Sequence, residues 1–512
     1  MRKLCRILFS RYSISALIIL GEILLVAYVI LGATAIFTYV VIALALLIDL
    51  ITVVAIVNRD ANPEYKVTWS VVVLCLPILG AFLYVIFYHR RITKKEERLL
   101  KGIFAEMNSR RLDNSAFYMM RRRSPLAAGK ARAIMNDDPT AELYGQSSST
   151  FFGTGEKYFE SLILDLREAK SFIFLEYYII ENGKLWNEIH TILREKAKEG
   201  VEVRVMYDDF GCMPTLPRHY ERRLRAEGIQ AYRFSPISPK MSSVHNNRDH
   251  RKICVIDGKV AYTGGVNIAD EYVNVIERFG HWKDGGIRLC GRVVRGLLKQ
   301  FLTNWDLTAK TVSAYDTYLS QVTPAAYDDG GYYLPFCSGP APIYKRPAGK
   351  NAFLNLINQA RNYVFITTPY LIIDYELTEA LCNAALRGVD VRIITPGIPD
   401  KKKIKIMTRS AYPYLMKSGV KIYEYTPGFI HEKCFVCDDK YAVVGTINFD
   451  YRSFVHNFEN AVWMYASPTC IAVKEEFLNT QRKSERVDEK NSRLSFVDWV
   501  TRNGIRLFAP LM

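Results

Sequence analysis

The stretch "HRKICVIDGKVAYTGGVN" at residues 250–267 decides the fold, because the chain repeats it as "HEKCFVCDDKYAVVGTIN" at residues 431–448. In both copies a lysine follows the histidine by two residues, an aspartate follows the lysine by five, and a glycine and an asparagine keep one spacing downstream. The matched residues are His250, Lys252, Asp257, Gly264 and Asn267 in the first copy, and His431, Lys433, Asp438, Gly445 and Asn448 in the second. One pattern of this kind carries little weight, whereas two copies with the same spacing indicate an internal duplication.

The second copy by itself looks like a metal-binding box. Its side chains that are able to bind a cation are His431, Glu432, Cys434, Cys437 and Asp438. At the matching positions of the first copy, Arg251 replaces Glu432 and isoleucines replace both cysteines. Because Arg and Ile bind no metal, and no second C-x-x-C accompanies Cys434 and Cys437, we expect neither a metal ion nor another cofactor.

Strand-like and helix-like segments alternate around both copies, which predicts an α/β fold. The first half has a strand pattern at 171–180, a helix pattern at 183–200 and a strand pattern at 201–209, and the second half repeats this order at 362–372, 375–388 and 389–397. The repeat period of about 180–190 residues is too long for a solenoid and suits two homologous domains. We place these domains at residues 140–325 and 326–512, after a basic linker at residues 96–139.

Residues 1–95 differ in composition from the rest of the chain. Residues 14–57 contain only two charged side chains, Glu22 and Asp49, and residues 67–88 form a second apolar run. A bilayer core requires about 20 apolar residues per helix. We therefore predict an N-terminal membrane anchor with apolar spans at about 14–33, 36–57 and 67–88. A signal peptide does not fit, because its apolar region covers only about 7–15 residues and ends at a cleavage site.

The orientation of this anchor stays open. Basic residues flank both ends of the apolar block, at 2–11 and at 90–95. The positive-inside rule places both flanks in the cytoplasm, which requires an even number of spans. Three full spans conflict with that rule, so either one segment is re-entrant or interfacial, or one flank lies outside.

The cysteines and the net charge indicate the compartment and the binding partner of the chain beyond the anchor. Ten cysteines are scattered singly, mostly in apolar segments, which fits a reducing compartment and places the bulk of the chain in the cytoplasm. The formal charge of +16 calls for a polyanion, either nucleic acid or an anionic membrane surface. For a protein tethered to a bilayer, basic clusters at 121–123 and 401–405 favour acidic lipid head groups, and we expect no nucleic acid.

The doubled motif predicts chemistry on a phosphodiester. Histidine and lysine two residues apart on a strand point to the same face. If the two halves meet, His250 and His431 converge on one phosphorus atom, while lysines 252 and 433 and asparagines 267 and 448 donate to its oxygens. One histidine then attacks phosphorus and the other protonates the leaving oxygen. We favour His250 as the nucleophile, although the pseudo-symmetry also allows the reverse assignment.

Each imidazole needs a carboxylate that fixes its tautomer. In the second half Glu459 lies 28 residues after His431, and in the first half Asp284 has the comparable place. We expect both to orient the rings; the alternative is that they are surface charges. Thr446 is a further candidate phosphate donor, and Arg452 is expected to be structural.

These residues resemble the phospholipase D superfamily over about residues 140–512. The stretches "NNRDHRKICVIDGKVAYTGGVNIADEY", "FGHWKD", "GTINFDYRSF" and the apolar "NPEYKVTWSVVVLCLPILGAFLYVIFYHR" are similar to the bacterial cardiolipin synthase branch. The resemblance implies two α/β/α-sandwich domains related by a pseudo-twofold axis, with one shared active site. It also implies that two phosphatidylglycerol molecules give cardiolipin and glycerol at the bacterial cell membrane. Glu432 departs from the small residue common at its position, and three apolar spans replace the usual two.

Two other functions remain as alternatives. Nothing in the motifs separates water from alcohol acceptors, so a phospholipase D hydrolase or another phosphatidyltransferase of the superfamily fits equally. The charge of +16 also leaves a membrane-tethered nuclease, although the basic runs do not alternate with aromatic residues as in single-strand-binding grooves. The oligomeric state is not indicated by the sequence.

Overall fold

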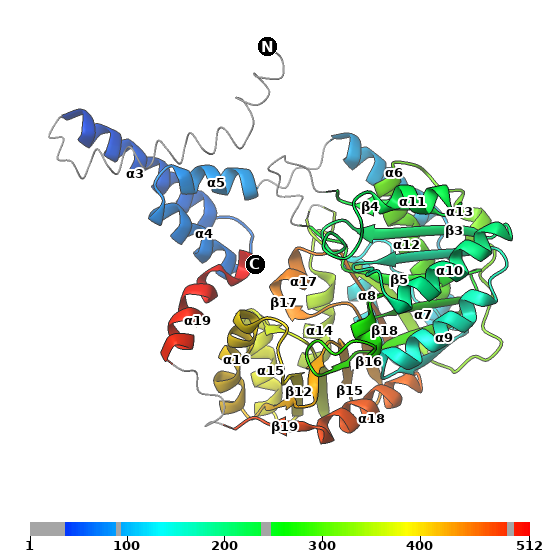
Figure 1. The fold of residues 1–512 in the computed structure, drawn as a ribbon. Helices are drawn as coiled ribbons and strands as arrows, with labels where there is room; N and C mark the ends of the chain where they lie inside the picture. Colours follow the sequence, from blue (N-terminus) through cyan, green and yellow to red (C-terminus); the bar gives the residue numbers. More distant parts are fainter. Residues whose placement is uncertain (1–35, 89–93, 237–246, 342, 489–495, 512) are drawn as a thin grey trace, which may run out of the picture. The chain divides into compact units, whose positions relative to one another are not determined.

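Contacts divide the chain into two units, and each is described by itself (Figure 1). The structure is a computed structural model that describes residues 36–88, 94–236, 247–341, 343–488 and 496–511. The first unit comprises residues 1–92, 237–247 and 504–512, and the second comprises residues 93–236 and 248–503.

Within its described residues, the first unit contains three apolar helices, α3 (Ile36–Val57), α4 (Pro63–Cys75) and α5 (Leu79–Tyr88). Helix α3 coincides with the predicted span 36–57, and the predicted span 14–33 lies outside the described residues. The helices pack around a small cluster formed by Ile56, Trp69, Val73, Ala81 and Tyr84. Among the helices that the structure describes, none has the combination of length and apolar character needed to cross a bilayer.

The segment 67–88 was predicted as one span, but the structure breaks it into α4 and α5. Pro77 lies at the break, where its ring prevents the helix from continuing. Ile78 follows with a φ of 64°, and its N–H donates to Asp49 Oδ1 at 3.2 Å. The prediction of a continuous helix over 67–88 is therefore wrong, and a helix–turn–helix replaces it.

The second unit begins with α6 (Lys94–Ser109), α7 (Ser115–Arg123) and α8 (Pro125–Asp137), where a basic linker was predicted. Ala127, Ala131 and Ile134 of α8 are buried in the core of the second half of the chain. Lys299 Nζ donates to the Met107 carbonyl at 3.2 Å and thereby ties α6 to the first half. These helices are part of the folded unit, because each buries an apolar face.

Two mixed sheets carry the repeated halves. In spatial order the first sheet contains β1 (Ser147–Phe152), β8 (Gly286–Gly291), β6 (Val260–Gly264), β5 (Lys252–Ile256), β2 (Phe172–Tyr177), β3 (Glu202–Asp208) and β4 (Gln230–Phe234). The second contains β9 (Tyr332–Ser338), β18 (Glu459–Tyr465), β16 (Tyr441–Gly445), β15 (Cys434–Cys437), β10 (Tyr363–Thr367), β12 (Asp390–Pro396), β13 (Lys421–Tyr425) and β19 (Ser484–Arg486). Apart from β19, the two sheets have the same strand order.

The strand directions match as well. Strands β2, β3 and β4 are parallel, and so are β10, β12 and β13, whereas the other neighbours within each sheet are antiparallel. Parallel neighbours require crossover helices, which are α10 (Lys184–Lys198) and α11 (Tyr220–Ala226) in the first half and α15 (Tyr375–Leu386) and α16 (Lys402–Lys417) in the second. The duplication read from the sequence is therefore confirmed as two α/β domains with one topology.

Helices cover both faces of each sheet. The remaining helices are α9 (Gly155–Arg167), α12 (Val294–Ala309), α13 (Tyr315–Leu319), α14 (Ala348–Gln359), α17 (Tyr451–Val455), α18 (Thr469–Arg482), α19 (Phe496–Phe508) and the 3-10 turns Asp270–Val273 and Ala509–Leu511. Helices α9 to α11 pack on one face of the first sheet, and α14 to α16 on one face of the second. Helices α12 and α18 share a core with the opposite faces of both sheets, which joins the two halves.

Short strands also join the halves near the predicted site. Strand β7 (His281–Lys283) of the first half pairs in parallel with β14 (Gly428–Ile430) of the second. An isolated parallel bridge joins Asp249 to Phe458 in the same way. We call these two connections the seam. Strands β11 (Leu371–Ile372) and β17 (Phe449–Asp450) form a separate pair within the second half.

Candidate active site

His250 and His431 lie just before β5 and β15, where the seam holds both main chains. The His250 N–H donates to the Phe458 carbonyl at 2.9 Å, and the His431 N–H donates to the Lys283 carbonyl at 2.7 Å. Each histidine is thus bound by main chain to the other half of the protein. Both residues are buried, with 8% and 7% of their surface exposed.

Each imidazole meets a carboxylate from the opposite half. His250 Nδ1 lies 2.9 Å from Glu459 Oε2, and His431 Nδ1 lies 2.6 Å from Asp284 Oδ2. An ionised carboxylate only accepts hydrogen bonds, so each ring carries its hydrogen on Nδ1 and keeps the Nε2 lone pair. The carboxylates expected from the sequence therefore contact the rings, and the pairing crosses between the halves.

The seam explains this crossing. Asp249 is bridged to Phe458, so the next residues, His250 and Glu459, emerge side by side. In the other copy Ile430 pairs with Lys283, and the next residues are His431 and Asp284. In parallel pairing, residues one step beyond a matched pair remain neighbours.

Two buried lysines accompany the histidines. Lys252 Nζ donates to the His250 carbonyl at 2.6 Å, and Lys433 Nζ lies 2.9 Å from His431 Nδ1. Burial lowers the pKa of Lys252 to about 7 and that of Lys433 to about 8. An anion bound between them would raise both pKa values again, because it stabilises the ammonium forms.

The two halves form one electrostatic cluster. Burial lowers the pKa of His431 well below its ordinary value, and the charges of Lys433, Lys252 and His250 lower it further. Burial likewise lowers the pKa of His250 to about 4. Both imidazoles are therefore neutral at pH 7, which is the form that is able to act as a nucleophile.

The two carboxylates that contact the imidazoles have different surroundings. Thr446 Oγ1 donates to Glu459 Oε2, and Asn457 Nδ2 lies 3.3 Å from Glu459 Oε1. Burial alone would raise the pKa of Glu459, but His250, Lys252 and the Thr446 hydroxyl lower it overall. Burial raises the pKa of Asp284 to about 6. Its half has glycine at the position that matches Thr446, and hence no equivalent hydroxyl donor.

Asp257 and Asp438 were predicted as catalytic, and the structure gives them another place. The Asp257 carboxylate accepts the main-chain N–H groups of residues 170, 171 and 172 at 2.7–3.0 Å. Asp438 accepts those of residues 361, 362 and 363 at 2.8–3.1 Å. Each follows the end of its strand that is remote from the histidine. The prediction of a catalytic role is corrected: both anchor the segment that enters the central strand of their sheet.

The predicted phosphate donors are close to the cluster but already bonded. Asn267 Oδ1 accepts the Ile179 N–H at 3.0 Å, and its Nδ2 donates to the Tyr272 hydroxyl at 2.7 Å. A hydrogen bond from Asn448 lowers the pKa of Asp450. An amide nitrogen carries two hydrogens, so each asparagine retains one for an oxyanion. Thr446, expected to donate to phosphate, gives its hydroxyl hydrogen to Glu459 instead.

Sequence reasoning missed the aromatic walls around the imidazoles. The Tyr178 ring centroid lies 5.0 Å from that of His250, and the Tyr272 and Trp282 centroids lie 5.4 Å and 5.6 Å from that of His431. These rings contribute to the burial that keeps the histidines neutral. Trp282 stands two residues before Asp284 in "HWKD", which is the signal that would have found it.

A buried ion network was missed as well. Arg251 Nε lies 2.9 Å from both Glu176 Oε1 and Asp249 Oδ1. The sequence does show a signal, because Glu176 interrupts the apolar strand "SFIFLEYYII". A carboxylate in a buried strand requires a partner.

The metal-box interpretation of the second motif conflicts with the geometry. Cys434 belongs to the core shared by both halves, whereas Cys437 belongs to the core on the opposite face of the sheet. The Glu432 carboxylate lies 3.1 Å from Lys283 Nζ. Cys434 Sγ lies 3.2 Å from Glu432 Oε1, but Cys437 lies on the other face of the sheet. The part of the chain that the structure describes contains no group of three potential metal ligands.

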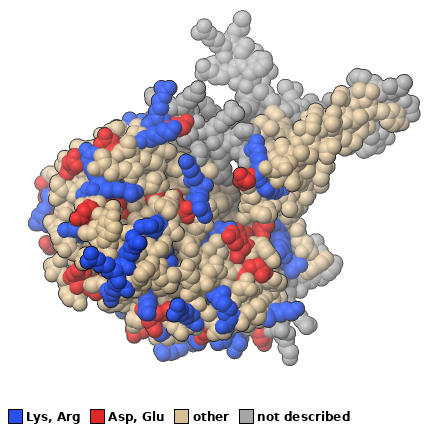
Figure 2. All heavy atoms as spheres, turned by 180° about the vertical axis from the view of Figure 1, so that it is seen from behind, with Lys and Arg blue, Asp and Glu red and all other residues tan. Residues whose placement is uncertain are grey.

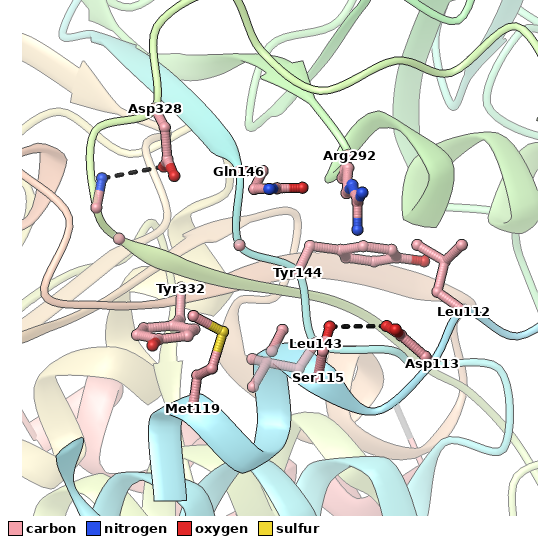
Figure 3. A pocket seen from close by; sticks show the side chains of 14 residues that line it. Leu112, Asp113, Ser115, Met119, Leu143, Tyr144, Gln146, Arg292, Asp328 and Tyr332 are labelled. Carbon is pink, nitrogen blue, oxygen red and sulfur yellow. Dashed lines mark hydrogen bonds between the residues drawn. The ribbon is translucent and has the colours of Figure 1, made fainter. Parts of the chain in front are cut away.

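A cavity of about 460 Å³ lies apart from these residues (Figure 3). Its walls come from α7, the approach to β1 and the start of β9, and Arg292, Gln146, Tyr332 and Met119 face it. None of the predicted site residues lines it.

Comparisons with known proteins agree with this arrangement. The family described as "Cardiolipin synthase, PLD-like domain" matches residues 162–276 and 353–480, one segment in each half. The family described as phospholipase D-nuclease N-terminal matches residues 41–87. The crystal structure of phosphatidylserine synthase from Haemophilus influenzae has a TM-score of 0.57 and 16% identity, covers 75% of this chain and 98% of its own, and shows the same fold.

Relatives match over nearly the whole chain. An uncharacterized protein of Streptococcus mutans is 42% identical over 444 residues, which cover 85% of this chain and 94% of that protein. Cardiolipin synthases of Alkalihalophilus pseudofirmus and Geobacillus kaustophilus are each 33% identical, over 89% and 90% of this chain and 90% and 91% of their own. Since both halves match the family and these identities extend over most of each relative, the chain belongs to the cardiolipin synthase family of phospholipase D-like proteins.

Proposed function

We propose that the protein is a membrane-attached phosphatidyltransferase that converts two phosphatidylglycerol molecules into cardiolipin and glycerol. One observation carries the proposal within the family: two buried imidazoles from different halves each contact a carboxylate of the other half. Two lysines complete a site for one phosphodiester anion.

In the first step an imidazole Nε2, for which we favour His250, attacks the phosphorus of one phosphatidylglycerol. A P–N bond forms, the bond from phosphorus to the terminal glycerol oxygen breaks, and His431 gives a proton to that oxygen. Glycerol leaves, and the phosphatidyl group stays on His250 as a phosphohistidine.

In the second step a hydroxyl of the other phosphatidylglycerol attacks the phosphohistidine. His431 accepts the hydroxyl proton, the P–N bond breaks, and cardiolipin is released. Both histidines return to their starting protonation states, so the cycle consumes two phosphatidylglycerols and needs no cofactor.

His431 must be protonated to act as the acid, although it is neutral in the free site. The bound phosphodiester supplies a negative charge next to the ring, which raises the histidine pKa. The Asp284 carboxylate on Nδ1 stabilises the imidazolium in the same way. Substrate binding therefore raises the His431 pKa, so that His431 takes up the proton that it later gives to the leaving oxygen.

The apolar helices of the first unit support attachment to a membrane. On α3 the side chains of Leu44, Leu47, Leu50 and Val54 are more than half exposed. The region that holds α3 is almost free of charged side chains in Figure 2, whereas Lys and Arg intersperse with Asp and Glu on the visible face of the second unit. An apolar surface of this kind marks contact with lipid or protein. The anchor predicted at 1–95, with catalytic domains in the cytoplasm, remains part of the proposal.

The product distinguishes this proposal from its closest alternative. Purified protein supplied with phosphatidylglycerol alone is expected to give cardiolipin and free glycerol in equal amounts. Phosphatidic acid as the main product would instead identify a phospholipase D hydrolase, and lipid-independent cleavage of DNA would identify a nuclease.

The shared site is tested with His250→Ala and His431→Ala. Each variant is expected to lose at least about 1,000-fold in turnover while keeping its thermal unfolding temperature, since each histidine has a separate role. Substantial activity in either variant would contradict a single site built from both halves.

A further inference from the structure

A buried ion pair stands directly behind the His431–Asp284 pair. Lys283 precedes Asp284 in the chain, Glu432 follows His431, and Lys283 Nζ lies 3.1 Å from Glu432 Oε2. Both residues are buried, with 5% and 3% of their surface exposed. Neither residue belongs to the predicted catalytic set.

The ion pair crosses the seam at the place where the main chains are already joined. The Lys283 carbonyl accepts the His431 N–H at 2.7 Å, so Lys283 holds the second half with both its main chain and its side chain. Its ammonium group also lies 3.0 Å from Glu476 Oε1 on α18 and donates to the Gly153 carbonyl. Four contacts fix Lys283, and through the adjacent peptide they fix Asp284.

The other copy of the seam is built differently. The residues at the matching positions are Phe458, before Glu459, and Arg251, after His250. The Arg251 guanidinium lies 5.6 Å from the centroid of the Phe458 ring, and its ion pairs are with Glu176 and Asp249 of its own half. An ion pair between Lys283 and Glu432 thus bridges the seam next to His431. The equivalent contact next to His250 is a cation–π interaction between Arg251 and Phe458.

We propose that Lys283, held by Glu432, is a positioning residue that keeps Asp284 ionised and pressed against the His431 ring. The proposal deepens the function above and rests on it, because it assigns Lys283 to the proton-handling half of that site. Glu459 has the Thr446 hydroxyl for the same purpose, whereas Asp284 accepts the Gly285 N–H and no hydroxyl from the position that matches Thr446, which is a glycine. The positive charge of Lys283 adds to those of Lys433 and Lys252 in lowering the Asp284 pKa.

The charges around Asp284 support this assignment. The ionisable groups that interact with Asp284 are His431, Lys433, Lys252, Lys283, Cys434, Tyr158 and Tyr272. Burial raises the Asp284 pKa, while Lys433, the Gly285 N–H, Lys252 and Lys283 lower it, with a balance at about 6. Loss of the Lys283 charge moves this pKa upward, so Asp284 becomes protonated at a higher pH.

The test is the pH dependence of turnover in Lys283→Met, which removes the charge and keeps the length of the side chain. The low-pH limb of kcat is expected to move upward by about 0.5–1 pH unit, so that activity at pH 6 falls several-fold relative to pH 8. Lys283→Arg keeps the charge and is expected to retain the wild-type limb. Glu432→Gln is expected to lower kcat without moving the limb upward, because Lys283 remains charged.

Lys299→Met is the matched control, since Lys299 is another buried lysine paired with a glutamate, Glu142, outside the site. It is expected to lower stability without changing the pH limb. If folded Lys283→Met keeps the low-pH limb of kcat at the wild-type pH, the proposal is overturned. Equal shifts of this limb in Lys283→Met and Lys299→Met would also overturn it. If Lys283→Met does not fold, the other two variants decide. An upward shift of the low-pH limb in Glu432→Gln would overturn the proposal. A shift of that limb in Lys283→Arg by about 0.5–1 pH unit would overturn it as well.

The same measurements are made with the soluble diester bis(4-nitrophenyl) phosphate. If the wild-type protein forms no cardiolipin but cleaves this diester, the proposed transferase function fails. The Lys283 proposal is then tested by the low-pH limb of diester cleavage in Lys283→Met, compared with that of the wild type.

Discussion

Replacement of Asp257 by Asn tests whether the aspartate of the doubled motif takes part in chemistry or in folding. Asp257 Oδ1 accepts two main-chain N–H groups, from residues 171 and 172, and Oδ2 accepts that of residue 170. Its φ of 53° is tolerated by Asn, so the substitution changes the hydrogen bonds with little backbone strain. One amide hydrogen bond is lost, and two change from a charged to a neutral acceptor.

The expected destabilisation follows from these bonds. Hydrogen bonds to charged acceptors contribute about 1.5–3 kcal/mol and neutral ones about 0.5–1.5 kcal/mol. Asp257 is 4% exposed, so water does not replace the lost bond easily. We expect Asp257→Asn to lower the free energy of unfolding by about 2–4 kcal/mol. Asp438→Asn is expected to cost about 1–2 kcal/mol, because two of its three bonds are exposed to water.

The assay combines thermal unfolding of the full-length protein in detergent with turnover per folded molecule. Asp257→Asn is expected to lower the unfolding temperature by about 2–5 °C and to keep turnover within about threefold of wild type. An unchanged unfolding temperature together with loss of turnover would refute the structural assignment and return Asp257 to the catalytic set.

Three further predictions concern the site and the anchor. Turnover is expected to rise with pH through about 6, where the Asp284 carboxyl becomes ionised, and a pH–rate profile of Asp284→Asn that retains this limb would contradict the assignment. Thr446→Val removes the hydroxyl that donates to Glu459 and is expected to lower kcat about fivefold, which corresponds to a hydrogen bond of about 1 kcal/mol. Initial rates with phosphatidylglycerol measure this effect, and a wild-type rate would show that Glu459 needs no such donor. Combined Leu47→Glu and Leu50→Glu substitutions place charges on the exposed face of α3 and are expected to shift the protein from the membrane fraction to the supernatant. Unchanged sedimentation of the double variant with the membrane fraction would show that this face does not contact lipid.

The sequence predicts the architecture of the second unit well. Two copies of one motif with one downstream spacing predicted the duplication, and the two sheets have the same strand order. Period-two and period-3.6 patterns predicted the strands and helices around them, because buried faces repeat with the geometry of each element. The region 96–139 was misjudged because its many basic residues suggested a linker, while the small residues of α8 that pack on the second half have no strong pattern.

The site was predicted in its residues but not in its connections. Spacing places Glu459 and Asp284 within their own halves, whereas their partners depend on which strands meet at the seam. Short parallel bridges such as Asp249 with Phe458 leave no pattern in a single sequence. Asp257 was misassigned for a related reason, because its partners are main-chain N–H groups, which every residue except proline possesses.

The exchange of carboxylates across the seam makes each half dependent on the other. A lone copy would carry a histidine without the acid that orients it, so it would work only after pairing with a second copy. Fusion of two copies in one polypeptide makes that encounter permanent, because the tethered partner is always present at high effective concentration. It also frees the two imidazoles to diverge, since a substitution at Glu459 or at Asp284 changes one ring and leaves its counterpart untouched.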